Sequence, residues 1–274
     1  MKKALFLLAL CSLVASMTVS VSAETKATAR EATIKPEIDG VIDQVWGDAD
    51  RMYGSYWGDT TEGLENLSIV NSYASLMWDA DGLYLLGVMY DTTVPEEDID
   101  ARNSIDFWVS ETYTADTVFD SADGDWHYCK ASTGEEVYYC GNETVYEEAT
   151  TAVAVYDDHY VVEIFCPWQT EGFAPAIGTK IGFTVSFNDD IDLDGGRDSY
   201  AYWETTEDSG SYWAETRALP KIEFVAGPEV AVEAPEADEP AADDTAAPVT
   251  SDAGIVAAAA VMAVAAGVVL SKKH

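Results

Sequence analysis

Residues 181–203 read IGFTVSFNDDIDLDGGRDSYAYW, and this stretch decides the fold. Apolar side chains at Phe183, Val185 and Phe187 alternate with hydroxyl residues, which is the period of a strand with one buried face. An acidic loop containing two glycines follows, and a second, aromatic strand leaves it at residues 199–203. The stretch therefore predicts two strands of an antiparallel sheet joined by a structured loop.

The loop carries a pattern of oxygen ligands. Asp190, Asp192 and Asp194 stand at alternate positions, and Asp198 is a further candidate ligand. Carboxylates at that spacing, with glycine allowing a sharp turn, suit a calcium ion. The full calcium-hand pattern is absent, because its twelfth position is Ala201 rather than glutamate. A structural calcium site is expected here, and a solvated acidic turn is the alternative.

The rest of the body also shows strand patterns. Turn signals such as Asp79-Ala-Asp-Gly82 separate short apolar or alternating runs, and the only helical pattern is a turn near residues 41–49. Many short strands with regular turns predict an antiparallel β-sandwich or barrel. The strands are expected at residues 69–77, 83–90, 104–110, 151–155, 160–166, 180–187, 199–203 and 219–225.

The first residues indicate export. Lys2 and Lys3 precede an apolar run, and a Val-Ser-Ala sequence ending at Ala23 supplies the small residues of a cleavage site. Residues 1–23 are therefore expected to be a secretory signal peptide, and residues 24–226 form the domain that remains. That length suits one large β domain.

The last residues indicate an anchor. Residues 253–270 carry no polar side chain and are followed by two lysines and a histidine, which predicts a transmembrane anchor with a basic tail over residues 253–274. Residues 227–252 form an acidic linker rich in proline and alanine. Residues 247–251 read APVTS and depart from the motif of wall-sorting signals, which favours the cell membrane over the wall. We expect a secreted protein anchored at the cell surface with its domain outside.

Charge excludes two classes of partner. Residues 24–252 contain 10 basic and 50 acidic side chains, a formal charge of −40. Repulsion on this scale argues against nucleic acid and against anionic lipid surfaces.

Three cysteines remain after the signal peptide. Cys129 and Cys140 flank a hairpin-like segment, and export permits a disulfide between them, although the sequence does not show whether they lie opposite one another. Cys166 lies in an apolar strand, where a cysteine behaves as a small buried hydrophobe.

Five segments, in order, resemble a known family. The segment IDGVIDQVW at 38–46 is similar to the opening of the family 9 carbohydrate-binding modules, and LMWDADGLYLLGVMYD at 76–91 is similar to their first hairpin. SIDF at 104–107 and YVVEIFCPW at 160–168 stand where the family carries similar strands. Residues 188–203 resemble the acidic loop and the strand that follows it.

The resemblance covers residues 31–225 and implies a β-sandwich, bound calcium and recognition of the ends of plant polysaccharides of the cellulose or xylan type. Family members clamp a sugar ring between two tryptophans. Trp203 matches the second clamp, whereas Asp100 occupies the position of the first, so Trp108 or Trp126 would have to replace it. Aromatic faces bury the C–H face of a sugar, and polar groups read its hydroxyls.

Two polar residues complete the site that the resemblance implies. Asp106 stands where the family has an acid that reads hydroxyl groups, and His127 corresponds to a family arginine. The alternatives are that Trp203 and Trp108 pack in the core and that Asp106 faces inward. Three other tryptophans at family positions are expected in the core: Trp46, Trp78 and Trp168.

Other classes of function have less support. Acidic residues are so abundant that finding two of them as a possible pair of glycosidase carboxylates is no evidence for catalysis. Neither a nucleophile elbow nor a catalytic zinc motif is present. Methionine and histidine occur without a pattern that would hold haem. We expect a non-catalytic carbohydrate-binding module for polysaccharide or oligosaccharide, with a hydrolase assembly as a further partner. The main alternative is a structural surface protein that keeps the fold without binding sugar, and another is an accessory domain of a glycoside hydrolase system.

Overall fold

A computed structural model describes residues 25–59, 67–91, 93, 102–113, 118–204 and 213–228. These residues belong to one compact unit, Met1–Val230. Within them, no helix has the length and apolar character needed to cross a bilayer. The predicted signal peptide and anchor lie outside the described residues, as does nearly all of the predicted linker.

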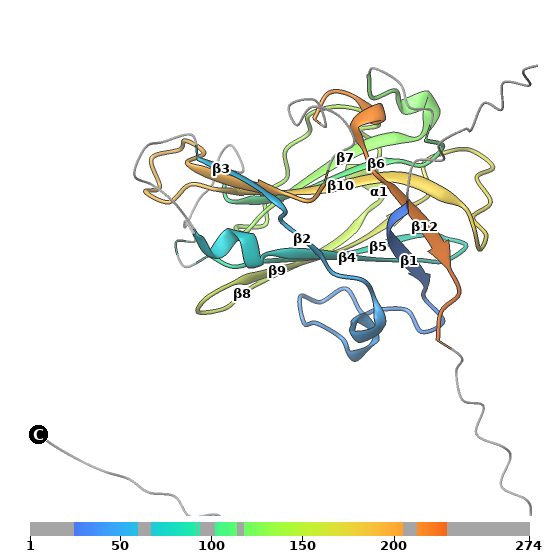
Figure 1. Cartoon of the computed structure of the whole chain (residues 1–274), viewed down its shortest axis with the longest axis horizontal. Helices are drawn as coiled ribbons and strands as arrows, with labels where there is room; N and C mark the ends of the chain where they lie inside the picture. Colours follow the sequence, from blue (N-terminus) through green and yellow to red (C-terminus); the bar gives the residue numbers. More distant parts are fainter. Residues whose placement is uncertain are drawn as a thin grey trace, which may run out of the picture. The chain divides into compact units, whose positions relative to one another are not determined.

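The described part of the chain is built almost entirely from strands, arranged in two layers (Figure 1). The strands are β1 (Thr25–Glu31), β2 (Met52–Tyr53), β3 (Tyr56–Asp59), β4 (Tyr73–Trp78), β5 (Gly82–Met89), β6 (Ser104–Ser110), β7 (Asp125–Ala131), β8 (Thr150–Val155), β9 (Tyr160–Pro167), β10 (Lys180–Asp189), β11 (Ser199–Tyr202) and β12 (Lys221–Val225). One short helix, α1 (Val145–Glu148), joins β7 to β8. Short 3-10 helices lie at Gln44–Asp48, Leu67–Asn71, Ser121–Asp123 and Thr216–Ala218.

The layers are two parts of one curled sheet. The front layer contains β3, β11, β10, β6 and β7, and the back layer contains β2, β4, β5, β9 and β8. Pairing within each layer is antiparallel. β12 pairs with β10 and β1 pairs with β4, and the parallel contact of β1 with β12 links the two layers. The expected antiparallel sandwich is therefore present, with two parallel contacts that the sequence did not predict.

The main core lies between the layers. It contains the inward side chains of β6 and β10, such as Phe107 and Phe183, and those of β5 and β9, such as Leu85 and Ile164, all fully buried. Burying a side chain of this size stabilises the fold by about 1.5–3 kcal/mol. A second cluster covers the outer face of the back layer, where Trp46 packs against β4 and β5.

The strand predictions were mostly correct. The prediction for residues 104–110 coincides with β6, and each other predicted strand contains an observed one or lies within a few residues of it. The prediction for residues 69–77 was wrong in its first part, because Leu67–Asn71 forms a 3-10 helix before β4 begins. β7 was not predicted, and neither were the three strands before β4.

Candidate functional site

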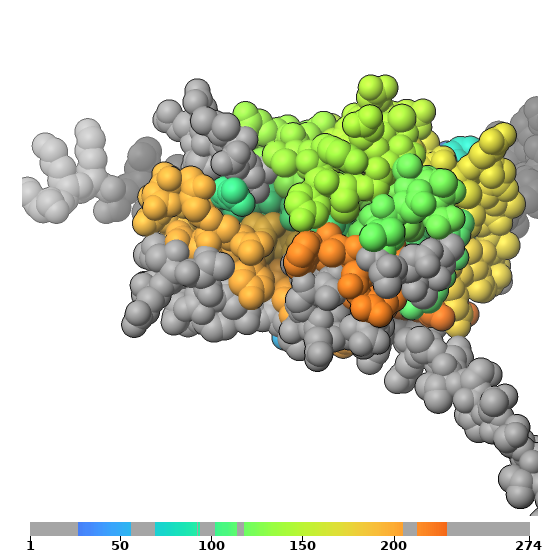
Figure 2. Space-filling model, turned by 90° about the horizontal axis from the view of Figure 1, so that it is seen from above, coloured from blue at the N-terminus to red at the C-terminus, as the bar shows by residue number. Residues whose placement is uncertain are grey.

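Polar side chains gather on the outer face of the front layer, which Figure 2 views from above. In the register of β6 and β10, Ser104 pairs with Asn188 and Asp106 pairs with Ser186. Because side chains alternate along a strand, these four point to the face opposite the core residues Ile105, Phe107 and Val185. The chain segments after β7 (light green) and around β11 (orange) border the same face in Figure 2.

Asp106 is the centre of this group. Its carboxylate accepts hydrogen bonds from Asn188 Nδ2 at 3.0 Å and from Ser104 Oγ at 3.1 Å. His127 Nε2 lies 3.8 Å from Asp106 Oδ2. Burial alone would raise the pKa of Asp106, but the contacts with His127, Cys129 and Ser104 outweigh it and leave the pKa below its usual value. The side chain is 16% exposed, so a charged acceptor is held within reach of solvent.

His127 lies beside Asp106 with unused hydrogen-bonding capacity. The residue is only 2% exposed, and neither ring nitrogen has a hydrogen-bond partner. Its ring packs against Trp108, with centroids 4.0 Å apart, and Tyr139 lies edge-on to both rings. Leaving a buried polar group without a partner costs about 1–3 kcal/mol, which a hydrogen-bonding ligand would recover. Tyr139 is 56% exposed and is the ring of this group that solvent reaches.

A second aromatic and cationic pair lies on the β11 side. Arg197 donates a hydrogen bond to Asn188 Oδ1 at 3.0 Å, and its guanidinium carbon lies 4.8 Å from the centre of the Tyr200 ring. No sugar-binding role was predicted for Asn188, Arg197, Tyr200 or Tyr139. The first three lie within the loop and strand of residues 188–203 that resemble the family, and this position could have indicated a role for them. No sequence pattern indicated a role for Tyr139.

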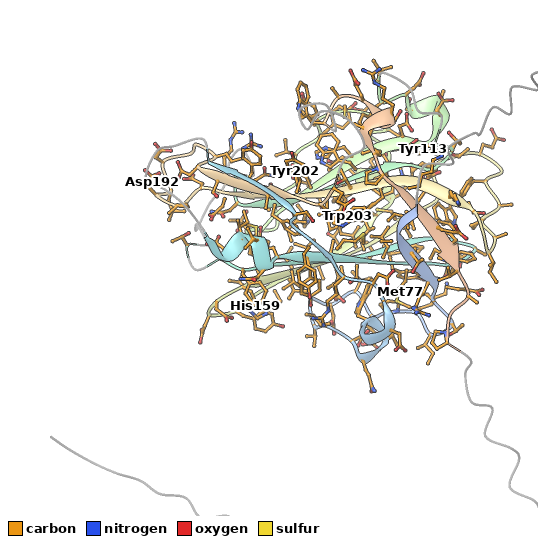
Figure 3. All side chains as sticks on the ribbon, viewed as in Figure 1. Met77, Tyr113, His159, Asp192, Tyr202 and Trp203 are labelled. Carbon is orange, nitrogen blue, oxygen red and sulfur yellow. The ribbon has the colours of Figure 1, made fainter. Side chains whose placement is uncertain are left out.

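Two of the predicted sugar-binding tryptophans are not on this face. Trp203 is 6% exposed and belongs to the main core near Phe183, and Figure 3 places it between the layers while Tyr202 lies on the outer side of the front layer. Trp126 is fully buried in the same core and donates its indole N–H to Glu111. Neither ring offers a free face to a sugar, so the structure does not support these two assignments.

Of the other residues singled out in the sequence, some lie on this face and some lie in the core. The structure brings Asp106, His127 and Trp108 together, although Trp108 is only 3% exposed. The position of the missing first clamp, Asp100, lies outside the described residues. The three tryptophans expected in the core do pack there: Trp46 and Trp78 are buried, and Trp168 is partly buried against the main core.

The acidic loop brings three carboxylates together. One oxygen from each of Asp190, Asp192 and Asp194 lies within 4.8 Å of the others. The pKa of Asp192 is raised, first by reduced contact with water and then by the neighbouring negative charges of Asp194, Asp198 and Asp190. Asp198 is not part of the converging group. Its Oδ2 accepts from the backbone N–H of Ile191 at 2.9 Å. A set of three carboxylates fits the oxygen chemistry of calcium.

The predicted disulfide is not formed in the structure. Cys129 and Cys140 are both free thiols, and the register explains why. Opposite β7, the bridge from Lys130 to Glu136 brings Cys129 beside Val137, with which it packs, and the bridge from Trp126 to Gly141 places Cys140 further along the strand. Cys166 is buried in the main core, as expected.

Comparison with known proteins gives the family. Residues 38–225 match the model described as carbohydrate family 9 binding domain-like. Over 183 residues the chain is 26% identical to the exoglucanase XynX of Acetivibrio thermocellus and 25% identical to endo-1,4-beta-xylanase A of Thermoanaerobacterium saccharolyticum. The alignments cover 66% of this chain but only 16% and 14% of those enzymes, so the chain spans a small part of their length.

Solved structures show the same fold. A family 9 carbohydrate-binding module from Caldicellulosiruptor kristjanssonii in complex with cellotriose gives a TM-score of 0.60 at 20% identity, covering 75% of this chain and 96% of that one. The module from the same organism in complex with glucose gives 0.59 at 20% identity, covering 74% and 97%. Since the family model matches well over half of the chain, this protein belongs to the family 9 carbohydrate-binding domains, which are non-catalytic modules.

Proposed function

We propose that this chain binds the ends of neutral β-linked oligosaccharides, of the cellulose or xylan type, on the outer face of β6, β7, β10 and β11. The observation that carries the proposal is the part-exposed Asp106 carboxylate beside His127, whose ring nitrogens have no hydrogen-bond partner. A carboxylate acceptor and an imidazole donor, set against aromatic rings, match the hydroxyl groups and the C–H face of a sugar.

Stacking is assigned to a ring that the sequence did not indicate. Trp203 is buried, whereas Tyr139 is 56% exposed and lies against His127 and Trp108. We infer that Tyr139 covers one face of the sugar ring while Asp106 and His127 hydrogen-bond its hydroxyls. The ligands of the Caldicellulosiruptor modules, cellotriose and glucose, support the choice of a neutral sugar. The matched enzymes, an exoglucanase and a xylanase, support the polymer class.

We further propose a structural calcium ion in the loop of Asp190, Asp192 and Asp194. The loop connects β10 to β11, and Asn188 and Arg197 lie at its two ends. Calcium there would hold Arg197 against Asn188 and so stiffen the site. Millimolar calcium should raise the melting temperature of the protein, because a ligand that binds only the folded state stabilises it. Asp192→Asn should weaken this rise and the exposed Asp158→Asn should keep it; no rise in the unaltered protein would exclude the ion.

The domain order favours display at the cell surface. We propose that residues 1–23 direct export, that residues 253–274 anchor the protein in the membrane and that residues 227–252 hold the module away from it. A tethered, non-catalytic binding module suits adhesion to polysaccharide or service in a hydrolase assembly.

The test of the binding site is a calorimetric titration of the full chain with cellotriose and xylotriose. Asp106→Asn should weaken binding by at least about tenfold, since a lost hydrogen bond to a charged group is worth about 1.5–3 kcal/mol. Asp158→Asn on the back layer, a matched change at a side chain that is 71% exposed, should leave affinity unaltered. If the folded protein gives no heat with any soluble glycan, the result would favour a structural surface protein. The burial of Trp203 would then explain why sugar is not bound.

A further inference from the structure

A groove of about 640 Å³ crosses the outer face of the back layer, away from the proposed sugar site. The register places Tyr84 of β5 beside Phe165 of β9, and Phe165 beside Thr150 of β8. These three residues form a row across adjacent strands. The segment around Lys35 and Ile38 and the turn at Asp81 supply the other walls.

The floor of the groove is aromatic and apolar. The rings of Tyr84 and Phe165 pack with centroids 4.8 Å apart. Tyr84 is buried, so it supports Phe165, which is partly exposed. The part-buried side chains of Ile38 and Pro167 line the same groove. A supported aromatic face flanked by aliphatic groups is the surface on which the C–H face of a pyranose packs.

The rim is polar and held in place. Lys35 Nζ lies 2.8 Å from both Asp79 Oδ2 and Asp81 Oδ2, and the Tyr84 hydroxyl donates to Asp79 at 2.8 Å. Asp81 is nevertheless 70% exposed and Lys35 56% exposed, and Thr150 adds an exposed hydroxyl. Donors and acceptors that are fixed by one another before a ligand arrives cost less entropy to use in binding.

The charges point to an uncharged ligand. Lys35 is matched locally by its two carboxylates, so the rim offers no excess positive charge. The chain as a whole carries a formal charge of −36, which disfavours anionic ligands. The volume is within the range of about 300–1,000 Å³ that small-molecule sites occupy, with an apolar floor and few polar groups. We propose that this groove is a second binding site for a neutral oligosaccharide, on the layer opposite the first.

This inference goes beyond the proposed function, because a module with sites on both layers can bridge two glycan chains. The experiment is a titration of the full chain with cellotriose, monitored by calorimetry and by amide chemical shifts. The chemical shifts also detect weak binding. Two sites are expected in the unaltered protein. Thr150→Arg should fill the groove and leave one site, whereas Ile177→Arg, a matched change at a residue that is 65% exposed and outside the groove, should leave two.

The outcomes separate the two sites. With Asp106→Asn, one site should persist, and the amides of Phe165 and Thr150 should still shift on adding cellotriose. Binding that Asp106→Asn abolishes and Thr150→Arg does not alter would overturn the second site and leave the proposed function intact. Binding that Thr150→Arg abolishes and Asp106→Asn does not alter would support the groove and overturn the front-layer site. Unshifted amides in the groove at saturating cellotriose would also reject the second site.

Discussion

Replacing Glu111 by glutamine should destabilise the protein more than its conservative chemistry implies. Glu111 follows directly after β6 and is 1% exposed. Its Oε1 accepts from Trp126 Nε1 at 3.0 Å and from the Gln169 backbone N–H at 2.9 Å, and its Oε2 accepts from the Thr170 backbone N–H at 2.8 Å. One buried carboxylate thus ties the end of β6 to β7 and to the segment after β9.

The size of the effect follows from these three donors. If the glutamine oxygen keeps the first two contacts, the amide nitrogen of the glutamine faces the N–H of Thr170. One hydrogen bond to a charged acceptor, worth about 1.5–3 kcal/mol, is then lost, and two donors face each other. The other two bonds weaken because their acceptor is no longer charged, and this loss is offset in part because no charge has to be buried. We expect a net loss of about 2–4 kcal/mol for Glu111→Gln.

Urea unfolding followed by tryptophan fluorescence measures this loss. With a slope of about 2 kcal/mol per M, the midpoint should fall by about 1–2 M. The exposed Glu37→Gln is the matched control and should change stability by less than about 0.5 kcal/mol. A loss below about 1 kcal/mol for Glu111→Gln, with the slope unchanged, would refute the view that these three donors depend on the carboxylate.

Three further outcomes are expected. Gly82→Ala should lower the melting temperature by several degrees, because its new Cβ would lie 2.2 Å from the carbonyl oxygen of Cys166; an unchanged melting temperature would show that the two strands can move apart. Burial and a hydrogen bond to a carboxylate raise the pKa of Tyr84 to about 12. The protonated hydroxyl therefore stabilises the folded protein fully below pH about 10, and this stabilisation is lost as the pH rises through 12. Urea midpoints from pH 9 to 11.5 should fall less in Tyr84→Phe than in the unaltered protein, and equal falls would contradict this. Alkylation of denatured, unreduced protein should modify both Cys129 and Cys140, and a mass that retains a disulfide would disprove the free thiols.

The fold was predictable where a single strand carries its own signal. β6 was placed correctly because its inward positions, Ile105, Phe107 and Val109, are all apolar and its first and last residues are serine. β7 was missed although it pairs with β6 along its whole length. Its sequence, DWHYCKA, mixes aromatic, charged and sulfur-bearing residues, so alternation in hydrophobicity does not show which face is buried.

The site was predictable to the same extent, and for a related reason. Asp106 and Trp108 share a face, because they are two residues apart in β6 and side chains alternate along a strand. For β11, the sequence Ser-Tyr-Ala-Tyr offers a tyrosine or a small residue at every position, so hydrophobicity does not decide which face turns inward. The pairing of Tyr202 with Ser186 decides it: Tyr202 shares the outer face with Ser186, and Trp203 falls on the core side. Family position alone therefore assigned the sugar contact to a ring that the register buries. The exposed Tyr139, to which we assign the stacking contact instead, lies on this face only because the chain after β7 folds back along that strand.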